Sequence, residues 1–152
     1  MKKKVKLSAS LEDYLEAIYL ISRERGEVRS KKIKERLQVS GPSVTEALKL
    51  LGDRGYVHYS PYEAITLTRK GKTVAKDVLH RHETLREFFI EVLGIDAKLA
   101  DEGACRMEHV ASANIIDRMV KYTQYLKLEC KGHGCDKVNC FDDYLKEEEA
   151  KT

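Results

Sequence analysis

A thiol, a carboxylate and an imidazole near position 105 are the side chains of this sequence best suited to chemistry. Cys105, Glu108 and His109 stand at positions i, i+3 and i+4 of one segment. On an α-helix with about 3.6 residues per turn, these positions share one face. Sulfur, oxygen and nitrogen ligands that converge in this way suit a divalent transition metal. The spacing therefore predicts a metal site on a helix, with a chance cluster of the same residue types as the alternative.

The composition indicates a folded protein without membrane spans. The chain has 152 residues, of which 42% are hydrophobic and 35% are charged, which is enough for one domain or two small ones. No apolar run approaches the roughly 20 residues of a membrane-spanning helix, and no apolar signal core follows the basic N-terminus. We therefore expect a cytoplasmic protein with no membrane partner. In that reducing compartment the four cysteines are expected to be ligands or free thiols rather than disulfides.

The charge is distributed unevenly along the chain. Residues 1–75 hold 16 Lys and Arg against 9 Asp and Glu, a net charge of +7, whereas residues 76–152 hold 12 against 16, a net charge of −4. A basic half favours an anionic polymer such as DNA, because phosphate contacts supply most non-specific affinity. An ordinary, functionless charge asymmetry is the alternative.

Two short helices with a tight turn between them are predicted in the basic half. The first is expected from its cap at Ser30 to about Leu37, and the second from Ser43 to about Arg54. Pro42 lies in the first turn of the second helix, where a missing N–H costs least. This pattern is typical of a helix-turn-helix. The second helix has an apolar stripe that we expect to be buried, formed by Val44, Ala47, Leu48 and Leu51.

A preceding helix is predicted over residues 10–24, capped by Ser10. Its apolar stripe leaves Asp13 and Glu16 on the opposite face. These two carboxylates either form a solvated acidic face or meet another domain.

The remaining segments complete a mainly α fold. Residues 56–59 and 64–68 predict a β-hairpin wing, and Gly71 begins a long helix to about Val92. Two further helices are expected at 97–111, opened by Asp96 or a neighbour, and at 113–126. These helices carry more apolar surface than a winged-helix domain needs, which indicates dimerisation unless they simply complete one core. The segment after Glu129 is expected to be irregular.

Five stretches of the sequence form a recognisable set of motifs, namely Leu11 to Tyr19, Ser40 to Thr45, Leu67 to Gly71, Arg81 to Glu83, and Asp101 to Val110. With these motifs, residues 8–127 resemble the diphtheria toxin repressor family of metal-dependent transcription repressors, which includes a manganese transport regulator branch. The resemblance implies a winged helix-turn-helix domain with a small β-hairpin wing at 1–72 and an all-helical metal-binding and dimerisation domain at 73–128. We expect a Cys/His-containing tail at 129–152, without an SH3-like domain.

The resemblance also implies a set of metal ligands. Asp13 and Glu16 match ligands of the manganese branch, whereas Cys105 matches a ligand of the iron branch. Glu108 and His109 match ligands of both branches. The chain therefore looks like a hybrid of the two.

An ancillary metal site is implied less directly. His82 matches one of its ligands, but Arg86 stands where relatives have an acidic ligand, and Asp101 stands near a histidine of the iron branch. The ancillary site is therefore absent or has different ligands.

The implied function is metal-dependent repression of genes for metal uptake and homeostasis. A metal held by Asp13 and Glu16 on one side and by Cys105, Glu108 and His109 on the other would fasten the two domains together. Carboxylate and imidazole suit Fe(II) or Mn(II), and the thiolate favours Fe(II), with Zn(II) or Co(II) binding in vitro. Fe(II) is therefore the expected co-repressor and Mn(II) the next candidate.

The expected partners are a second copy of the chain and double-stranded DNA with a palindromic operator, because a symmetric dimer places two recognition helices about 34–36 Å apart. For any single lysine, solvation without a DNA contact is the alternative. The side chains expected to contact DNA are Ser40, Pro42, Ser43, Thr45, Glu46, Lys49, Arg69 and Lys70.

Parts of the sequence are also compatible with other functions. The tail could hold a second metal through Cys130, His133, Cys135 and Cys140, could sense thiol oxidation as part of a winged-helix regulator, or could be unstructured. A metal buffer without a DNA role is a further alternative. Cys105 and His109 could form a nucleophile and base, but the pattern offers no oxyanion hole, so neither an enzyme nor a small organic substrate is expected.

Overall fold

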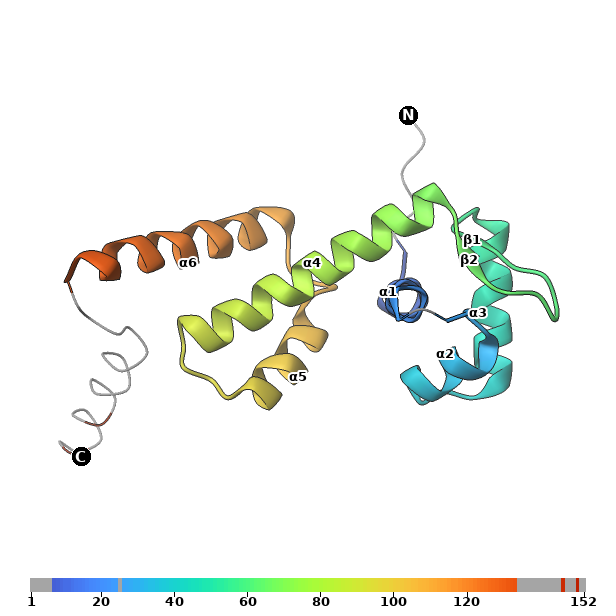
Figure 1. Ribbon diagram of the computed structural model, residues 1–152, viewed down its shortest axis with the longest axis horizontal. Helices are drawn as coiled ribbons and strands as arrows, with labels where there is room; N and C mark the ends of the chain where they lie inside the picture. The colour runs from blue at the N-terminus through green and yellow to red at the C-terminus, as the bar shows by residue number, and fades with distance from the viewer. Residues whose placement is uncertain (1–6, 25, 134–145, 147–149, 151–152) are drawn as a thin grey trace. The chain divides into compact units, whose positions relative to one another are not determined.

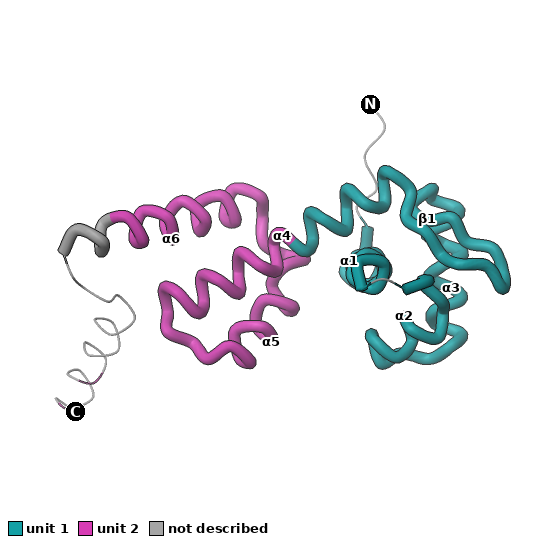
Figure 2. Tube along the Cα trace, in the orientation of Figure 1, with its two compact units in different colours: residues 1–79 teal, residues 80–152 magenta. Residues whose placement is uncertain are grey.

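The computed structural model describes residues 7–24, 26–133, 146 and 150. The chain divides into two compact units, Met1–Leu79 (unit 1) and His80–Thr152 (unit 2) (Figure 2). The division falls inside helix α4, which runs from Arg69 to Glu91. The described residues are mostly helical with one small sheet (Figure 1), which confirms the predicted fold class.

Unit 1 contains the predicted three helices and hairpin. Its helices are α1 (Ala9–Arg23), α2 (Ser30–Leu37) and α3 (Gly41–Asp53). The strands β1 (Val57–His58) and β2 (Thr66–Leu67) pair antiparallel, with Val57 opposite Leu67. The first part of α4 completes the unit.

The core of unit 1 joins apolar side chains from every helix of the unit. Leu15 and Ile18 of α1 and Leu48 and Leu51 of α3 are fully buried within it. Val44 and Ala47 are buried as well, so the predicted stripe of α3 is confirmed. Because this stripe is buried, the opposite face of α3 is exposed to solvent.

The helix caps differ in part from the prediction. Ser8, and not Ser10, caps α1, since its backbone is extended and its hydroxyl accepts a hydrogen bond from the Leu11 N–H. Ser40 caps α3 in the same way, accepting from the Ser43 N–H at 3.2 Å. Ser30 is the first residue of α2 rather than its cap, which is Arg29.

Helix α4 begins where it touches the hairpin. Thr68 Oγ1 donates to the Gly55 carbonyl at 2.8 Å and accepts from the Gly71 N–H at 3.1 Å. A Cβ at position 71 would lie 2.0 Å from the Tyr56 carbonyl oxygen. Only glycine permits this approach of backbone to backbone. Because α4 begins at Arg69, Gly71 lies inside the helix that it was predicted to begin.

Unit 2 consists of the second part of α4, α5 (Ala97–Met107) and α6 (Ala113–His133). Asp96 caps α5 as predicted, accepting from the N–H groups of Lys98 and Leu99. The core cluster of the unit is formed by Leu85, Ala104 and Ile116. Phe89, Ala111 and Met119 pack against it while remaining partly exposed.

Two helix ends in unit 2 depart from the prediction. Helix α5 ends at Met107 instead of residue 111, although Glu108 keeps a right-handed helical backbone as its C-cap. Helix α6 continues to His133, so residues 130–133, which were expected to be irregular, are helical.

Candidate metal centre and DNA-binding face

Three potential metal ligands converge in unit 2. His82 lies on α4, Cys105 on α5, and Glu108 caps α5. One ligand atom from each lies within 4.8 Å of the others. His82 Nδ1 is 2.7 Å from Glu108 Oε2 and 3.7 Å from Cys105 Sγ. Nitrogen, oxygen and sulfur therefore face one another, and this donor set fits a divalent transition metal.

The Glu108 carboxylate is the buried member of the centre. Its side chain is 1% exposed, whereas the Cys105 thiol is exposed. A buried carboxylate requires charged or hydrogen-bonding partners, and Glu108 has an imidazole at each oxygen. Oε2 lies beside His82 Nδ1, and Oε1 lies 3.2 Å from His109 Nε2. The adjacent residues Glu108 and His109 thus bring a carboxylate and an imidazole together.

The hydrogen bond that His82 donates to the Glu108 carboxylate is the largest cause that raises the pKa of His82 from 6.5 to about 9, against the opposing effect of burial. Asp101 contributes to the same rise. At neutral pH without metal, His82 is therefore an imidazolium that neutralises Glu108. A metal that binds His82 must displace this proton.

The other ring nitrogen of His82 faces a second carboxylate. Nε2 lies 3.0 Å from Asp101 Oδ1, and the Arg86 Nε lies 3.6 Å from the same oxygen. The sequence prediction identified Arg86 and Asp101 as departures from the family but missed their contact. The helical spacing indicates which residues share a face, because Arg86 follows His82 by four residues and Asp101 precedes Cys105 by four.

The remaining predicted ligands lie in different parts of the chain. His109, 11% exposed, belongs to unit 2 and contacts Glu108, whereas Asp13 and Glu16 are partly exposed residues of α1 in unit 1. Cys130 and His133 fall in the last turn of α6. Cys135 and Cys140 lie outside the described residues.

The outer face of α3 carries the predicted DNA contacts. Pro42, Ser43, Glu46 and Lys49 are exposed, and Thr45 is partly exposed. The Ser40 and Ser43 hydroxyls are 2.8 Å apart, so they form one polar patch at the start of the helix. Helix α2 also exposes basic residues, namely Lys31, Lys32, Lys34 and Arg36.

Arg69 and Lys70 belong to the first turn of α4 rather than to the strands of the wing. The Lys70 ammonium donates to the Arg54 carbonyl at 2.9 Å and lies 3.9 Å from the centroid of the Tyr56 ring. Lys70 thus ties α4 to the end of α3. Arg69 is exposed.

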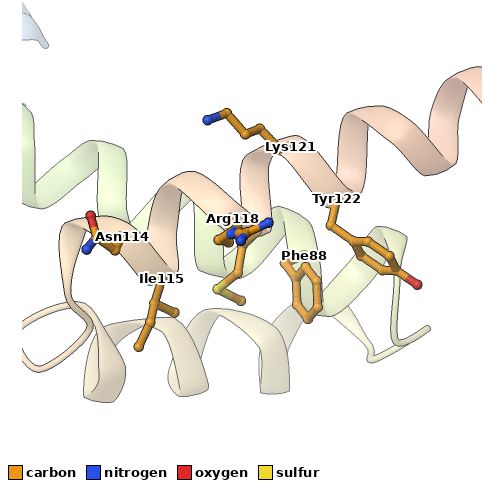
Figure 3. A pocket seen from close by; sticks show the side chains of 7 residues that line it. Phe88, Asn114, Ile115, Arg118, Lys121 and Tyr122 are labelled. Atoms are coloured by element: carbon orange, nitrogen blue, oxygen red, sulfur yellow. The ribbon is translucent and has the colours of Figure 1, made fainter.

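An apolar surface depression lies between α4 and α6 in unit 2. Its volume is about 680 Å³, and its lining includes the Phe88 ring and the apolar side chains Ile115, Met119 and Tyr122 (Figure 3). Ile115 is 54% exposed and Tyr122 is 50% exposed. Further large apolar side chains that unit 2 exposes are Leu99, Met107, Val110, Tyr125 and Leu128.

Among the described residues, no helix is both long enough and apolar enough to span a membrane.

Comparison with protein families matches both units. Residues 6–65 match the family described as iron dependent repressor, N-terminal DNA binding domain. Residues 68–135 match the family described as iron dependent repressor, metal binding and dimerisation domain.

Curated relatives cover most of the chain. An uncharacterised HTH-type transcriptional regulator of Methanocaldococcus jannaschii is 40% identical over 122 residues, which is 80% of this chain and 98% of the relative. The HTH-type transcriptional regulator MntR of Bacillus subtilis is 36% identical over 118 residues, 78% of this chain and 82% of the relative.

Solved structures of similar proteins include the manganese regulator SloR, with 30% identity and a TM-score of 0.68 over 76% of this chain. The IdeR protein of T. acidophilum has 26% identity and a TM-score of 0.68 over 77% of this chain. The chain spans about half the length of these solved proteins, 54% and 55% respectively.

Proposed function

Because the chain belongs to the iron-dependent repressor family of metal-responsive DNA-binding regulators, we propose that it represses genes of metal uptake and homeostasis when Fe(II) or Mn(II) is bound. Members of this family are transcriptional regulators, so the chain is a regulator and not an enzyme. The comparisons give no support to the alternative of a thiol-oxidation sensor. A regulator of this kind acts in the cytoplasm, where its DNA is.

The observation that carries the proposal is that His82 and Cys105 lie close to the buried carboxylate of Glu108. A divalent cation would supply the positive charge that this donor set otherwise takes from protons. The residues themselves must release those protons, His82 from Nδ1 and Cys105 from Sγ, for the site to bind metal. Metal binding is then coupled to pH and to the local arrangement of α4 and α5.

We propose Fe(II) as the co-repressor, with Mn(II) as the competing candidate. Glu108 and the imidazoles accept either ion, whereas the thiolate of Cys105 favours Fe(II), Co(II) or Zn(II) over Mn(II). The names of two similar proteins, a manganese regulator and a relative called MntR, are the argument for Mn(II). Replacing Cys105 by glutamate is expected to move the preference toward Mn(II).

On the basis of the sequence resemblance, we propose that metal binding is coupled to DNA binding. In this proposal Asp13 and Glu16 of unit 1 join Cys105, Glu108 and His109 of unit 2 as ligands of the same centre. Without metal, the carboxylates of Asp13, Glu16 and Glu108 would repel one another at this centre. A metal ion that binds all of these ligands would favour one arrangement of the two units over the others. The ion can shift this equilibrium only by the difference between its affinities for the arrangements.

We further propose that α3 enters the major groove and that two copies of the chain read a palindromic operator. The exposed Ser43, Glu46 and Lys49 support this role for α3. The exposed apolar residues of unit 2 support its role in forming the dimer, because patches of this kind mark protein interfaces. Successive half-sites about 34–36 Å apart would match the symmetry of such a dimer.

The test is operator binding titrated with Fe(II), Mn(II), Co(II) and Zn(II) under anaerobic conditions. A DNA duplex is first selected from a random library by the metal-bound protein. We expect Cys105→Ala and Asp13→Ala to weaken metal-stimulated binding far more than metal-free binding, with Glu102→Ala on the exposed side of α5 as the control. Equal loss in both states would argue against the switch. Binding that responds to peroxide but not to a chelator would favour the redox alternative.

A further inference from the structure

The two ring nitrogens of His82 have different surroundings. Nδ1 faces the candidate centre, 2.7 Å from Glu108 Oε2 and 3.7 Å from Cys105 Sγ. Nε2 faces away from those two atoms and lies 3.0 Å from Asp101 Oδ1. One imidazole therefore links the metal-binding donors to a carboxylate that is 55% exposed.

Asp101 has a partner of its own. The Arg86 Nε lies 3.6 Å from Asp101 Oδ1, and both side chains are partly exposed. His82 and Arg86 are one turn apart on α4, and Asp101 and Cys105 are one turn apart on α5. Two residues of each helix thus form a chain of contacts in the order Arg86, Asp101, His82 and Cys105.

The contact between His82 Nε2 and the Asp101 carboxylate resembles one that is common at metal-binding histidines. A histidine that binds metal through one nitrogen commonly donates the N–H of the other to a carboxylate, which fixes the tautomer and the ring orientation and raises the basicity of the ligand. The Asp101 side chain is 55% exposed, and water screens the attraction of an exposed carboxylate for its partner, so the contact contributes little to stability. The contact between Asp101 and His82 is therefore better explained by orientation of the imidazole than by stabilisation of the fold.

We propose that Asp101, held by Arg86, is a positioning residue that presents His82 to the metal through Nδ1 and keeps the proton on Nε2. This inference rests on the proposed function, because it requires that His82 binds metal. It also assigns a role to the two departures from the family pattern. With Nε2 occupied by Asp101 and the Arg86 cation next to that carboxylate, a second cation at Nε2 is disfavoured by charge and by the lack of a lone pair.

The experiment uses the full chain labelled with ¹⁵N and titrated with ¹¹³Cd(II), a diamagnetic probe that binds thiolate and imidazole. The signals of His82 are assigned by comparison with His82→Gln. Occupancy is followed at the His82 signals alone, so that ions held by other cysteines do not enter the measurement. We expect ¹¹³Cd–¹⁵N coupling at Nδ1 and a retained proton on Nε2.

The key variant is Asp101→Ala, with Glu102→Ala as the matched control. Both remove one exposed carboxylate from neighbouring positions of α5, but only Asp101 contacts His82. Asp101→Ala is expected to lose the protected Nε2 proton and to weaken Cd(II) binding at His82 by about 10- to 100-fold, the usual effect of removing such a partner. Asp101→Asn, whose amide oxygen can still accept from Nε2–H, is expected to recover part of the affinity.

Three results would overturn the inference. One is coupling of cadmium to Nε2, and another is coupling of two ions to the same imidazole, which would make Asp101 a ligand. The third is equal behaviour of Asp101→Ala and Glu102→Ala. If operator binding still depends on metal in any of these cases, the proposed function stands and only the role of Asp101 falls. A wild-type chain that binds neither Cd(II), Fe(II) nor Mn(II) at His82 would overturn both.

Discussion

Unit 1 and unit 2 use their apolar residues in opposite ways. Unit 1 buries Leu15, Ile18 and Leu48 completely in one continuous core. Unit 2 has a core cluster of only three buried residues among those described, and it exposes Ile115 and Tyr122 on α6. Unit 1 therefore satisfies its hydrophobic surface internally. Unit 2 leaves part of that surface for a partner and places a polar centre beside its small core.

The same contrast holds for charge. The first half of the chain carries a net charge of +7 and the second half −4, and the basic residues include exposed positions of α2 and α3. In unit 2 the most deeply buried ionisable group of the centre is the Glu108 carboxylate, at 1% exposure. One unit thus presents positive charge to an anionic polymer, while the other assembles negative charge suited to a cation.

The largest expected effect tests the core of unit 1. Leu48→Ala should lower the free energy of unfolding of unit 1 by about 2–5 kcal/mol, because it leaves a cavity in a close-packed interior. Leu50→Ala, on the same helix but 37% exposed, is the control and should cost clearly less. Urea unfolding followed by circular dichroism measures both. Equal losses would mean that α3 is not anchored as its burial indicates.

The next effect tests the apolar surface of unit 2. Tyr122→Asp places a charge on that surface and should raise the dimer dissociation constant by about 30-fold or more, an effect of about 2 kcal/mol or larger typical of interface hot spots. Tyr62→Asp alters an aromatic residue of unit 1 that is 98% exposed and should leave the dimer unchanged. Sedimentation equilibrium distinguishes the two. Dimerisation that fails in Tyr62→Asp instead would place the interface on unit 1.

A smaller effect concerns pH. The pKa of His82 is raised to about 9 by Glu108, so its contribution to stability is fully present below its unfolded value of about 6.5 and is lost as the pH rises through 9. Metal affinity should move in the other direction, and displacement of the His82 proton should contribute a rise of about tenfold per pH unit over that window. Calorimetric titration with Mn(II) at several pH values measures this slope. His82→Gln should remove the part of the slope that belongs to this proton, and an unchanged slope would contradict the assignment.

The smallest effect concerns a single phosphate contact. Lys49→Ala should weaken binding to all DNA sequences several-fold and reduce the slope of log K against log salt by about 1. Lys121→Ala, which removes an exposed lysine from unit 2, is the control and should leave the slope unchanged. Fluorescence anisotropy at increasing salt provides the measurement. A change in sequence preference with Lys49→Ala would instead indicate contact with a base.

Much of this architecture could be predicted from local sequence signals. Pro42 in the first turn of α3 and Asp96 before α5 act within a few residues of their own position, so the sequence alone reveals them. Cys105 and Glu108 could be grouped by helical spacing, and the structure brings them together with His82. The shorter α5 did not disturb that spacing, because the backbone of Glu108 remains helical.

Other features depend on contacts between distant segments. The Thr68 hydroxyl, which accepts from the Gly71 N–H of α4, donates to the Gly55 carbonyl thirteen residues away. His82 and Asp101, which are nineteen residues apart in the sequence, link α4 to α5. Helical spacing places His82 with Arg86 and Asp101 with Cys105 on one face of each helix, but it does not encode which distant residues come into contact. The cap of α1 was misassigned for a different reason, since Ser8 and Ser10 are both suitable capping residues and only the backbone conformation distinguishes them.

The close approach of Gly71 to the Tyr56 carbonyl also limits how this protein could be recombined with its relatives. Thr68 binds the start of α4 to the Tyr56 carbonyl beside the hairpin, and Lys70 binds it to the end of α3. A chimaera joined upstream of Gly71 would therefore have to preserve these contacts between segments from two different parents. A junction placed between Gly71 and His82 takes the hairpin and its contacts with α4 from one parent and the His82 imidazole from the other. Engineered sensors that combine a new operator specificity with this metal centre should therefore be spliced within that stretch of α4.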